Sequence, residues 1–460
     1  MSLMHCPVHK TITLPYTLKL FLVLLFLFGC KGNATPLDNP IFEVDDQVPL
    51  IPTRTLGSGS GYLTIDGKAL SIKPGEIIAI TPGTYKDLSF INLNGTATQP
   101  ITVVANGPVE VVGGGITLEN VSNLTVTGYR KAKNIFLHDV TYRAITITGS
   151  IPQALTLEGI RLKNVEDYAL FYDNTTTYNG TDATAFLNFK LLHCDFDHTG
   201  GIQINGNLNN SAGVVNNGLC KNPEIAYCTF KNCPTVETLL YIGNVEGCDI
   251  HHNVLDDING GTDKHNGIFL LLGNGRVHHN KCTNHQGNFV RFWPFSQGSQ
   301  PKEVLLYNNI VWNSRKYSAL EVQSFAYHII PGVSTYCNTK VFNNTAGKMN
   351  TSKPTVFVGV VVDVYNLQGG DIQIFNNLSF QQIETSANDK IWSQQSITKP
   401  SLVANNRYFA TSAAAGLADE VSFKLLATSP AKKAGLYQSI LMDDFYNTPR
   451  ANPPSIGAVE

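Results

Sequence analysis

Seven short segments of the chain repeat one pattern, in which a strand-like run closes on Asn or Cys and an apolar residue returns within two positions. The gaps between successive closing residues are 34, 25, 27, 29, 35 and 33 residues. A fixed short unit at uneven spacing is typical of a solenoid in which each coil carries a loop of its own length. The closing residues are Cys194, Cys228, Asn253, Asn280, Asn309, Asn344 and Asn377.

A second strand-like run lies between successive closing residues and completes the unit. After Asn253 comes a loop, and then residues 267–272 form an apolar run that ends at a Gly-Asn-Gly turn. Strand, Asn turn, short strand, loop, strand and Gly turn together predict one coil of a parallel β-helix. The protein is therefore expected to be an all-β solenoid with an internal Asn ladder, whose amides satisfy turn backbone that would otherwise be buried unpaired. Corresponding second runs are residues 201–204, 239–242, 288–293 and 318–323.

Charge and cysteine content exclude two classes of protein. Charged residues make up 15% of the chain and the formal net charge is −2, which gives no electrostatic basis for binding nucleic acid. The cysteines do not predict a disulfide scaffold, because an odd number follows the first thirty residues, and no CxxC pair suggests a zinc site. We expect seven cysteines to be small buried apolar side chains: Cys194, Cys220, Cys228, Cys233, Cys248, Cys282 and Cys337.

The first thirty residues predict a secretion signal that is not part of the fold. Basic residues precede an apolar run over residues 20–28, which is too short to span a bilayer. The run ends at Gly29-Cys30, which resembles the bacterial lipobox and implies a lipidated Cys30 at the mature N-terminus. Residues 31–55 are expected to be a tether. We therefore expect a bacterial cell-envelope lipoprotein that is monomeric and contacts the membrane only through its lipid.

The Asn ladder resembles that of the right-handed pectate-lyase-like superfamily of parallel β-helix proteins. The segment Pro82-Gly83-Thr84-Tyr85 is similar to the first coils of secreted bacterial members, including chondroitinase-B-like alginate lyases. Residues 453–460 look like their closing segment. The resemblance covers residues 56–460 and implies one right-handed β-helix domain whose closing segment starts at about residue 420. It is specific for the fold and not for the reaction, because this scaffold hosts many activities.

In that superfamily, substrates lie along a groove beside the strand that precedes the Gly turn. Strand alternation predicts which side chains of this strand face outward, and neighbouring coils about 4.8 Å apart would join them into one patch. Aromatic rings beside Arg and Glu suit a sugar, because rings stack on sugar faces and a guanidinium binds a carboxylate bidentately. The predicted outward residues are Gln203, Tyr241, Phe269, Leu271, Arg291, Trp293, Glu321 and Gln323.

Loops beside this strand add further charged side chains. Lys264 and His265 enter one coil before Arg291 does, and Glu321 lies one coil beyond it. These four are the predicted catalytic residues of a lyase that acts on an anionic polysaccharide. Lys264 or His265 would abstract the proton next to a uronate carboxylate, which Arg291 or a cation neutralises. The predicted substrate-binding residues are Tyr241, Phe269, Trp293, Arg315, Lys316 and Tyr317, and Tyr317 or His265 would protonate the leaving oxygen.

Histidine pairs and aspartates offer metal ligands, with different expectations. The pairs His251-His252 and His278-His279 precede the ladder, where we expect a structural stack of rings and not a metal site. Asp257 and Asp263, together with Asp256, are candidate Ca²⁺ ligands, as acidic groups are in some pectate lyases. The spacing of these aspartates matches no calcium-binding motif.

Three functions remain open from the sequence. The first is a polysaccharide lyase that cleaves a uronate-containing glycan by β-elimination. The second is a glycoside hydrolase with two carboxylates, for which Glu321 and Asp263 are the predicted pair. The third is a surface lipoprotein that binds a glycan through Tyr241, Phe269 and Trp293 without cleaving it.

Overall fold

The computed structural model describes residues 47–352, 358–383, 390–395 and 398–460. The signal segment, Cys30 and residues 31–46 of the expected tether lie outside the described residues. Residues 47–53 are bound to the first coils, since the backbone N–H of Leu50 donates to the Tyr129 hydroxyl at 2.8 Å. The N–H of Thr53 likewise donates to the carbonyl of Ile77 at 2.8 Å.

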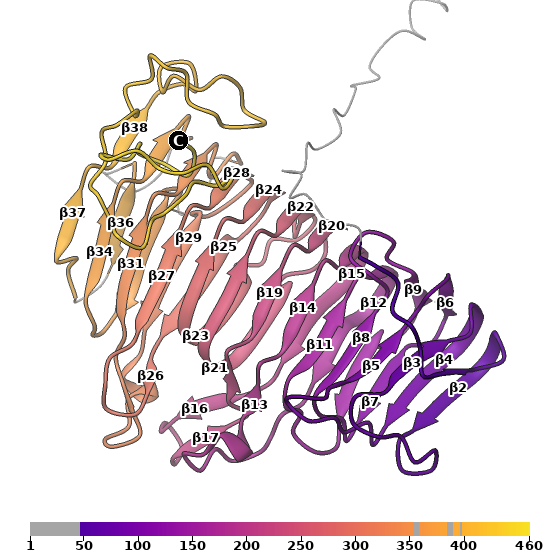
Figure 1. Cartoon of the computed structure of the whole chain (residues 1–460). Coiled ribbons are helices and arrows are strands. Elements are labelled where there is room, and N and C mark those ends of the chain that lie inside the picture. The colour runs from indigo at the N-terminus through magenta and orange to yellow at the C-terminus, as the bar shows by residue number, and fades with distance from the viewer. Residues whose placement is uncertain (1–46, 353–357, 384–389, 396–397) are drawn as a thin grey trace, which may run out of the picture. The chain divides into compact units, whose positions relative to one another are not determined.

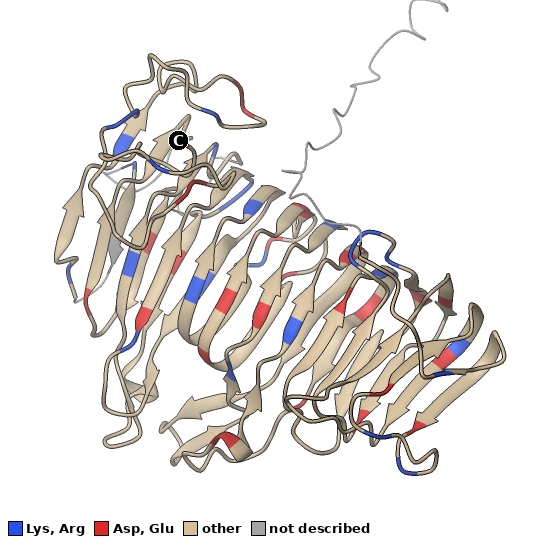
Figure 2. Cartoon of the chain, in the orientation of Figure 1, with Lys and Arg blue, Asp and Glu red and all other residues tan. Residues whose placement is uncertain are grey.

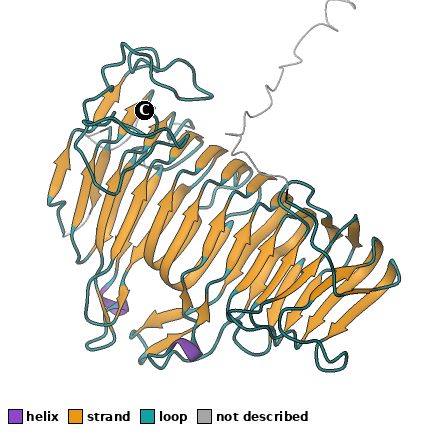
Figure 3. Cartoon of the chain, viewed as in Figure 1, coloured by secondary structure: helices purple, strands orange, loops and turns teal. Residues whose placement is uncertain are grey.

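The described chain winds into a parallel β-helix, in which successive coils add strands to three parallel sheets (Figures 1 and 3). Within one coil a strand of sheet 1 leads through the Asn turn into sheet 2, then through a loop into sheet 3. The first coils of Figure 1 are indigo and the last are yellow, so that the colours follow the stacking order. The predicted all-β solenoid is confirmed.

The strands of each sheet follow chain order from coil to coil. Sheet 1 contains β1 (Arg54–Leu56), β3 (Ile77–Ile80), β5 (Ile101–Val104), β8 (Leu124–Thr127), β11 (Leu155–Glu158), β14 (Lys190–Leu192), β19 (Glu224–Ala226), the ends of β21 (Leu240–His251) and β23 (Gly267–His278), β27 (Glu303–Tyr307), β31 (Asn338–Phe342), β34 (Ile372–Phe375) and β37 (Leu402–Ala404).

Sheet 2 contains the strands that follow the Asn turn. They are β6 (Val109–Val112), β9 (Ile135–Val140), the first parts of β12 (Ile160–Tyr172) and β15 (Asp195–Ile204), β20 (Thr229–Cys233), β22 (Val254–Ile258), β24 (Lys281–His285), β28 (Ile310–Ser314), β32 (Thr345–Gly347), β35 (Leu378–Phe380) and β38 (Arg407–Phe409).

Sheet 3 carries the strands that precede the next turn of the coil. It contains β2 (Ser60–Asp66), β4 (Gly83–Ile91), β7 (Ile116–Glu119), β10 (Ile145–Thr148), the later parts of β12 and β15, the first parts of β21 and β23, β25 (Asn288–Pro294), β29 (Leu320–Ser324), β33 (Val362–Leu367) and β36 (Trp392–Gln395).

Short elements lie beside the three sheets. Two antiparallel pairs project from the loops, and two single turns of 3-10 helix accompany them. These elements are the pair β16 (Asn207–Asn209) and β17 (Val215–Asn217), the pair β26 (Ser296–Gln297) and β30 (Ser334–Thr335), η1 (Asp182–Thr184) and η2 (Ala326–His328). The short strands β13 (Phe186–Leu187) and β18 (Cys220–Lys221) instead belong to the parallel solenoid, where β18 pairs with the middle of β21. No helix in the described part of the chain has the length and apolar character needed to cross a membrane.

The Asn ladder is formed as predicted and runs through the turn between sheets 1 and 2. The side-chain oxygen of Asn280 accepts the backbone N–H of Asn253 at 3.0 Å, and Asn309 does the same for Asn280 at 3.1 Å. Each Nδ2 also donates to a carbonyl of the preceding coil, as Asn309 does to Val277 at 2.9 Å. The ladder extends one coil further than predicted, to Asn406. All seven cysteines after the signal are free and buried, as expected.

The last fifty residues pack against the outside of sheet 2 and the neighbouring Asn turns without adding strands to the solenoid. Phe423, Phe445 and Ile456 pack with Trp312 and Phe380 in one apolar cluster over sheet 2. The guanidinium of Arg450 is buried and donates to the side-chain oxygen of Asn308 at 2.7 Å and to the carbonyl of Gly457 at 2.9 Å. The segment thereby covers outward-facing apolar side chains of β28 and β35, which are separate from the internal core.

Candidate functional site

A row of polar side chains crosses the outer face of sheet 3 near the C-terminal coils. Arg291 of β25 pairs with Glu321 of β29, Glu321 with Asp363 of β33, and Asp363 with Ser393 of β36. Their strand neighbours face the core, because side chains alternate between the two faces of a strand. The buried neighbours are Val290, Phe292, Leu320, Val322, Val362 and Val364. We call Arg291, Glu321, Asp363 and Ser393 the acidic row.

Glu321 is the centre of this row and is only 1% exposed. Its Oε1 lies 2.5 Å from Nε of Arg291 and also accepts a hydrogen bond from Gln323. Burial raises the pKa of Glu321, but hydrogen bonding to His265 and the charge of Arg291 outweigh burial, so that the pKa is lowered. The carboxylate is therefore ionised and held in place from two sides.

His265 reaches the row from the loop between β22 and β23. Its Nε2 lies 2.9 Å from Oδ1 of Asn288 and 3.3 Å from Oε2 of Glu321. Asn288 presents its oxygen to the imidazole, because its Nδ2 donates to the carbonyl of Ser318 at 3.1 Å. Two acceptors at Nε2 place the proton there in the neutral ring, which leaves the lone pair on Nδ1.

The ring of His265 is fixed by stacking as well as by hydrogen bonds. The ring of Tyr317 lies parallel to it, with the centroids 3.7 Å apart and 14° between the planes. Tyr317 adopts a positive φ of 77° at the end of its loop, which brings the ring beside the row. Nδ1 of His265 makes no hydrogen bond within the described part of the chain, and the side chain is 34% exposed. His265 is thus oriented as a proton acceptor.

Asp363 was missed by the sequence reasoning. It accepts a hydrogen bond from the Ser393 hydroxyl at 2.7 Å and is 8% exposed. Burial raises the pKa of Asp363 to about 6, and Glu321 in the adjacent strand adds to the rise. A single acid within the β-branched run 360–364 was the available signal, since strand alternation would have turned it outward. Two neighbouring carboxylates therefore have pKa values shifted in opposite directions.

The other predicted charged residues lie in loops beside the row. Nζ of Lys264 contacts Oε1 of Glu237 at 2.5 Å, and the Lys264 side chain is 70% exposed. Lys316 and Arg315 both bind Asp263, at 2.7 Å and 3.3 Å. The structure thus brings His265, Arg291, Glu321 and Tyr317 together, whereas the ammonium group of Lys264 is held on a different carboxylate.

Three aromatic residues were predicted to form a sugar-stacking patch, and one assignment was wrong. Phe269 is fully buried and packs against Phe289 in the core, with ring centroids 5.0 Å apart. Leu270 takes the outward position instead, paired with Arg291. The run 268–272 is apolar throughout, so that it offered no alternation from which to read the facing side.

Tyr241 and Trp293 occur on the outer face of sheet 3 but are partly covered. Together with Leu270 they pack against an apolar cluster that includes Phe295 and Ile330. Trp293 also makes an edge contact with Phe325, with ring centroids 4.8 Å apart. Tyr241 lies two strands before Arg291, and Trp293 follows Arg291 on β25. Both rings pack in a loop cluster and do not form an open stacking platform.

The predicted calcium ligands do not form a coordination sphere. Asp263 is 77% exposed and is bound by two cations, which would compete with a calcium ion. Asp257 lies within β22, where burial and the adjacent Asp256 raise its pKa. Within the described residues, no three His, Cys, Asp or Glu side chains are arranged to hold a metal ion. The arrangement of these residues does not fit Ca²⁺.

The histidine pairs form the stack of rings that the sequence predicted. His251 and His278 lie in parallel with centroids 5.1 Å apart, and His252 and His279 with centroids 4.8 Å apart. Within each pair the two Nδ1 atoms share a hydrogen bond, of 2.7 Å in the first and 2.6 Å in the second. Tyr307 continues the first stack, and Asp443 of the closing segment contacts the second.

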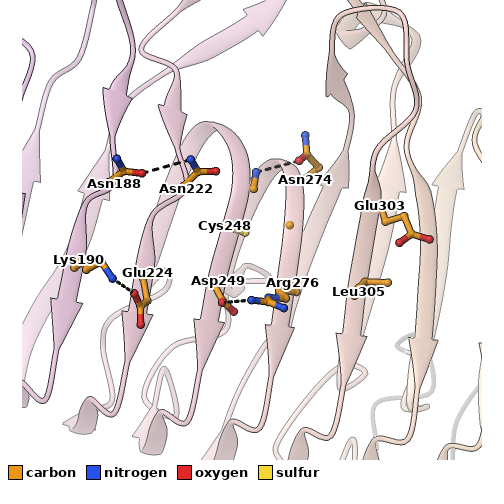
Figure 4. A pocket seen from close by; sticks show the side chains of 12 residues that line it. Asn188, Lys190, Asn222, Glu224, Cys248, Asp249, Asn274, Arg276, Glu303 and Leu305 are labelled. Atoms are coloured by element: carbon orange, nitrogen blue, oxygen red, sulfur yellow. Dashed lines mark hydrogen bonds and ion pairs between the residues drawn. The ribbon is translucent and has the colours of Figure 1, made fainter. Parts of the chain in front are cut away.

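A second polar groove lies on sheet 1 and has a volume of about 520 Å³ (Figure 4). Figure 4 shows two ion pairs along it, Lys190 with Glu224 at 2.6 Å and Arg276 with Asp249 at 2.6 Å. These pairs are part of the charged rows that cross the strands in Figure 2. Each acid in this groove has its own cation, so that we find no group there that is poised for chemistry. We call these four residues the paired row.

No family model matches the chain, and no curated protein matches it. The chain is similar to the solved structure of a pectate lyase, with 15% identity, a TM-score of 0.43 and coverage of 89% of this chain and 97% of that one. It is also similar to an alginate lyase from Paenibacillus sp. str. FPU-7, with 14% identity, a TM-score of 0.42 and coverage of 75% and 100%.

A polysaccharide lyase of the PL6 family from Pseudopedobacter saltans is a third similar structure, with 13% identity and a TM-score of 0.44. The match covers 77% of this chain and 93% of that one. The fold assignment rests on the strand register described above and not on these distant similarities.

Proposed function

We propose that this protein is a polysaccharide lyase that cleaves a uronate-containing glycan by β-elimination. The observation that supports this proposal is the orientation of His265. Its Nε2–H is held by Asn288 and Glu321, while Nδ1 faces no acceptor or donor within the described residues. An oriented imidazole with a free lone pair is the usual general base at neutral pH.

The proposed reaction uses His265 as the base at the sugar carbon next to the carboxylate. Nδ1 takes the C5 proton, the electron pair forms the C4=C5 double bond, and the C4–O4 bond breaks. The imidazolium that forms is stabilised by the ionised Glu321, 3.3 Å from Nε2. The proton can then pass from Nδ1 to the departing O4, so that the chain leaves as an alcohol and His265 returns to its neutral form.

Arg291 is the proposed binding partner of the uronate carboxylate. Only its Nε is used by Glu321, and its two Nη groups make no hydrogen bond within the described part of the chain. A guanidinium can bind a carboxylate through such paired donors. Neutralising the carboxylate makes the neighbouring C–H more acidic, because the charge that develops in the transition state is stabilised.

A glycoside hydrolase is the second candidate function, and one observation favours it. Glu321 and Asp363 lie on neighbouring strands, and their pKa values are displaced in opposite directions, to about 6 for Asp363. Such a pair is typical of an acid and a base that act on a glycosidic bond. In this reading Asp363, and not Asp263 as the sequence suggested, is the partner of Glu321.

The experiment follows two products at once. Purified protein is incubated with alginate, polygalacturonate and glycosaminoglycans, and both ultraviolet absorbance of a new C=C bond and new reducing ends are recorded. We expect both signals to rise together on at least one polymer. Reducing ends without absorbance would sink the lyase and support the hydrolase. Absence of both signals on every polymer, with binding retained, would leave a glycan-binding protein.

Matched histidine variants connect the activity to the site. His265→Gln removes the proposed base. His138→Gln is the control. His138 also contacts a carboxylate, that of Asp139 at 2.8 Å, but it lies on sheet 2 and many coils before His265. We expect only the first variant to lose the absorbance signal.

The cellular location is a separate proposal that rests on the sequence alone. We propose that Cys30 carries a lipid that anchors the protein to the cell envelope, because Gly29-Cys30 follows an apolar run in the lipobox pattern. Fractionation of cells that express the full chain tests it. The wild type is expected with the membranes and Cys30→Ala in the soluble fraction, and equal distribution would contradict the proposal.

A further inference from the structure

A second cavity opens on the same outer face of sheet 3, several coils before the acidic row. It has a volume of about 320 Å³ and is lined by β10, the end of β12 and the residues after β12. Phe171 in this cavity belongs to the same outward register as Arg291, through Gln203, Tyr241 and Leu270. Four strand spacings separate Phe171 from Arg291, or about 19 Å.

Arg143 presents unused donors to this cavity. The carbon at the centre of its guanidinium lies 3.5 Å from the centroid of the Phe171 ring, so that the group is stacked on an aromatic face. Its Nε is buried and makes no hydrogen bond. The nearest carboxylate, Asp167, is 3.6 Å from Nε, beyond normal hydrogen-bond distance. The side chain is therefore positioned by ring stacking and by an ion pair with Asp167, while its N–H groups make no hydrogen bond within the described residues.

Asn174 supplies a second donor that lacks a partner. The residue is 2% exposed, and its Nδ2 is buried without a hydrogen bond. The amide cannot simply be turned over, because its Oδ1 accepts the backbone N–H of Thr176 at 3.3 Å. Buried amide donors are nearly always satisfied in folded proteins, by protein groups or by ordered water, so that Asn174 can donate to a molecule that occupies the cavity.

The remaining polar groups of the cavity suit a sugar more than an isolated anion. Asp173 also lines it, with one carboxylate oxygen accepting from Nδ2 of Asn205 at 2.8 Å. A carboxylate in the wall disfavours binding of a simple anion, but it can accept a hydrogen bond from a sugar hydroxyl. Arg143 and Asn174 together can donate to a carboxylate. We propose that this cavity binds a carboxylate-bearing sugar unit of the polysaccharide whose cleavage is proposed at His265.

The inference rests on the proposed function only for the identity of the polymer, so its test measures binding and not cleavage. The His265→Gln protein is run through native gels that contain alginate, polygalacturonate or hyaluronan. We expect retardation in at least one gel. Replacing Arg143 by Ala should weaken that binding by about tenfold or more, the effect of losing hydrogen bonds to a charged group. Asn174→Ala should weaken binding in the same gel.

Arg161→Ala is the matched control, because the Arg161 guanidinium also stacks on a ring, that of Phe136 at 4.4 Å, but outside the cavity. Retardation of the Arg161 variant should equal that of the parent protein. Carboxyl-reduced polymer should bind equally well to the parent and the Arg143 variant. The inference is overturned if no gel retards the parent, or if the Arg143 and Arg161 variants behave alike. Absence of the lyase signal from the wild-type protein on every polymer, with Arg143-dependent binding intact, would overturn the proposed reaction alone.

Discussion

The acidic row of sheet 3 and the paired row of sheet 1 have the same strand spacing but differ in how their charges are balanced. In the paired row Glu224 and Asp249 each have their own cation, and the side chains of Lys190 and Arg276 are 44% and 47% exposed. In the acidic row two buried carboxylates lie beside a single Arg291. Exposure to solvent and one-to-one pairing make the paired row a stable polar surface. Burial and incomplete pairing give the acidic row a carboxyl with a raised pKa, Asp363, and an oriented imidazole.

The largest expected effect comes from neutralising one acid in each row. Glu321→Gln would place an amide donor beside Nε2 of His265, which favours the tautomer with the proton on Nδ1 and removes the base. We expect kcat to fall by about 100-fold to 10,000-fold, the usual contribution of a general base. Asp249→Asn in the paired row should leave kcat unchanged. Equal losses in both variants, measured as initial rates, would show that the rows do not differ in function.

Removing the cation of each row tests the difference in burial. Arg291→Ala leaves Glu321 buried beside a weakened set of partners and should cost about 3 kcal/mol of unfolding free energy. Arg276→Ala breaks a pair whose cation is half exposed and should cost less than Arg291→Ala, about 1 kcal/mol. Urea unfolding of both variants at neutral pH provides the comparison. A larger cost for Arg276→Ala would contradict the account of burial.

Asp363 of the acidic row and Glu224 of the paired row should respond to pH with opposite signs. The folded-state pKa of Asp363 is raised to about 6, so that its contribution to stability is present below pH 4 and is lost as the pH rises through 6. Asp363→Asn should therefore stabilise the protein at pH 8, by up to about 3 kcal/mol, with no gain at pH 4.

Glu224 of the paired row should show the reverse behaviour. Hydrogen bonding to His251, against an opposing effect of burial, lowers the pKa of Glu224 to about 2, and Lys190 adds to the decrease. Its contribution to stability is present above the ordinary pKa of a glutamate and is lost as the pH falls towards 2. Glu224→Gln should thus be less stable than the wild type at pH 7. Unfolding midpoints across pH measure the change in stability of both variants relative to the wild type. A pH dependence of the same sign in Asp363→Asn and Glu224→Gln would contradict the comparison.

The smallest expected effect is that of Lys264, which the sequence placed among the catalytic residues. Its ammonium group contacts Glu237 at the surface and not the acidic row. Lys264→Ala should change kcat/KM by less than about twofold, because exposed pairs contribute little energy. A loss comparable with that of His265→Gln would mean that the loop rearranges when substrate binds.

The fold could be predicted from the repeated Asn and Cys positions. An Asn in each coil can bond the Asn of the next coil only when the coils stack in register. The same pattern assigned Arg291 and Glu321 to one outward row, since their strands alternate clearly. It failed at Phe269, where five consecutive apolar residues hide the alternation. Loop side chains such as Lys264 were beyond prediction, because loop conformation depends on contacts, here with Glu237, that no periodicity encodes.

Asp363 and Asn288 show why the chemistry was less predictable than the fold. Asp363 matters because burial and Glu321 raise its pKa, and burial of one strand is set by loops from several coils. Asn288 matters because its amide is oriented by the carbonyl of Ser318, thirty residues away. Neither relation leaves a pattern in the local sequence.

The central claim is that His265 carries its proton on Nε2 and a lone pair on Nδ1. Nitrogen-15 NMR of histidine-labelled protein reports the tautomer of each imidazole, and the loss of one signal pair in His265→Gln assigns this residue. We predict the Nε2–H tautomer for neutral His265 in the wild type and a shift towards Nδ1–H in Glu321→Gln. An Nδ1–H tautomer in the wild type, or no change in Glu321→Gln, would contradict the account.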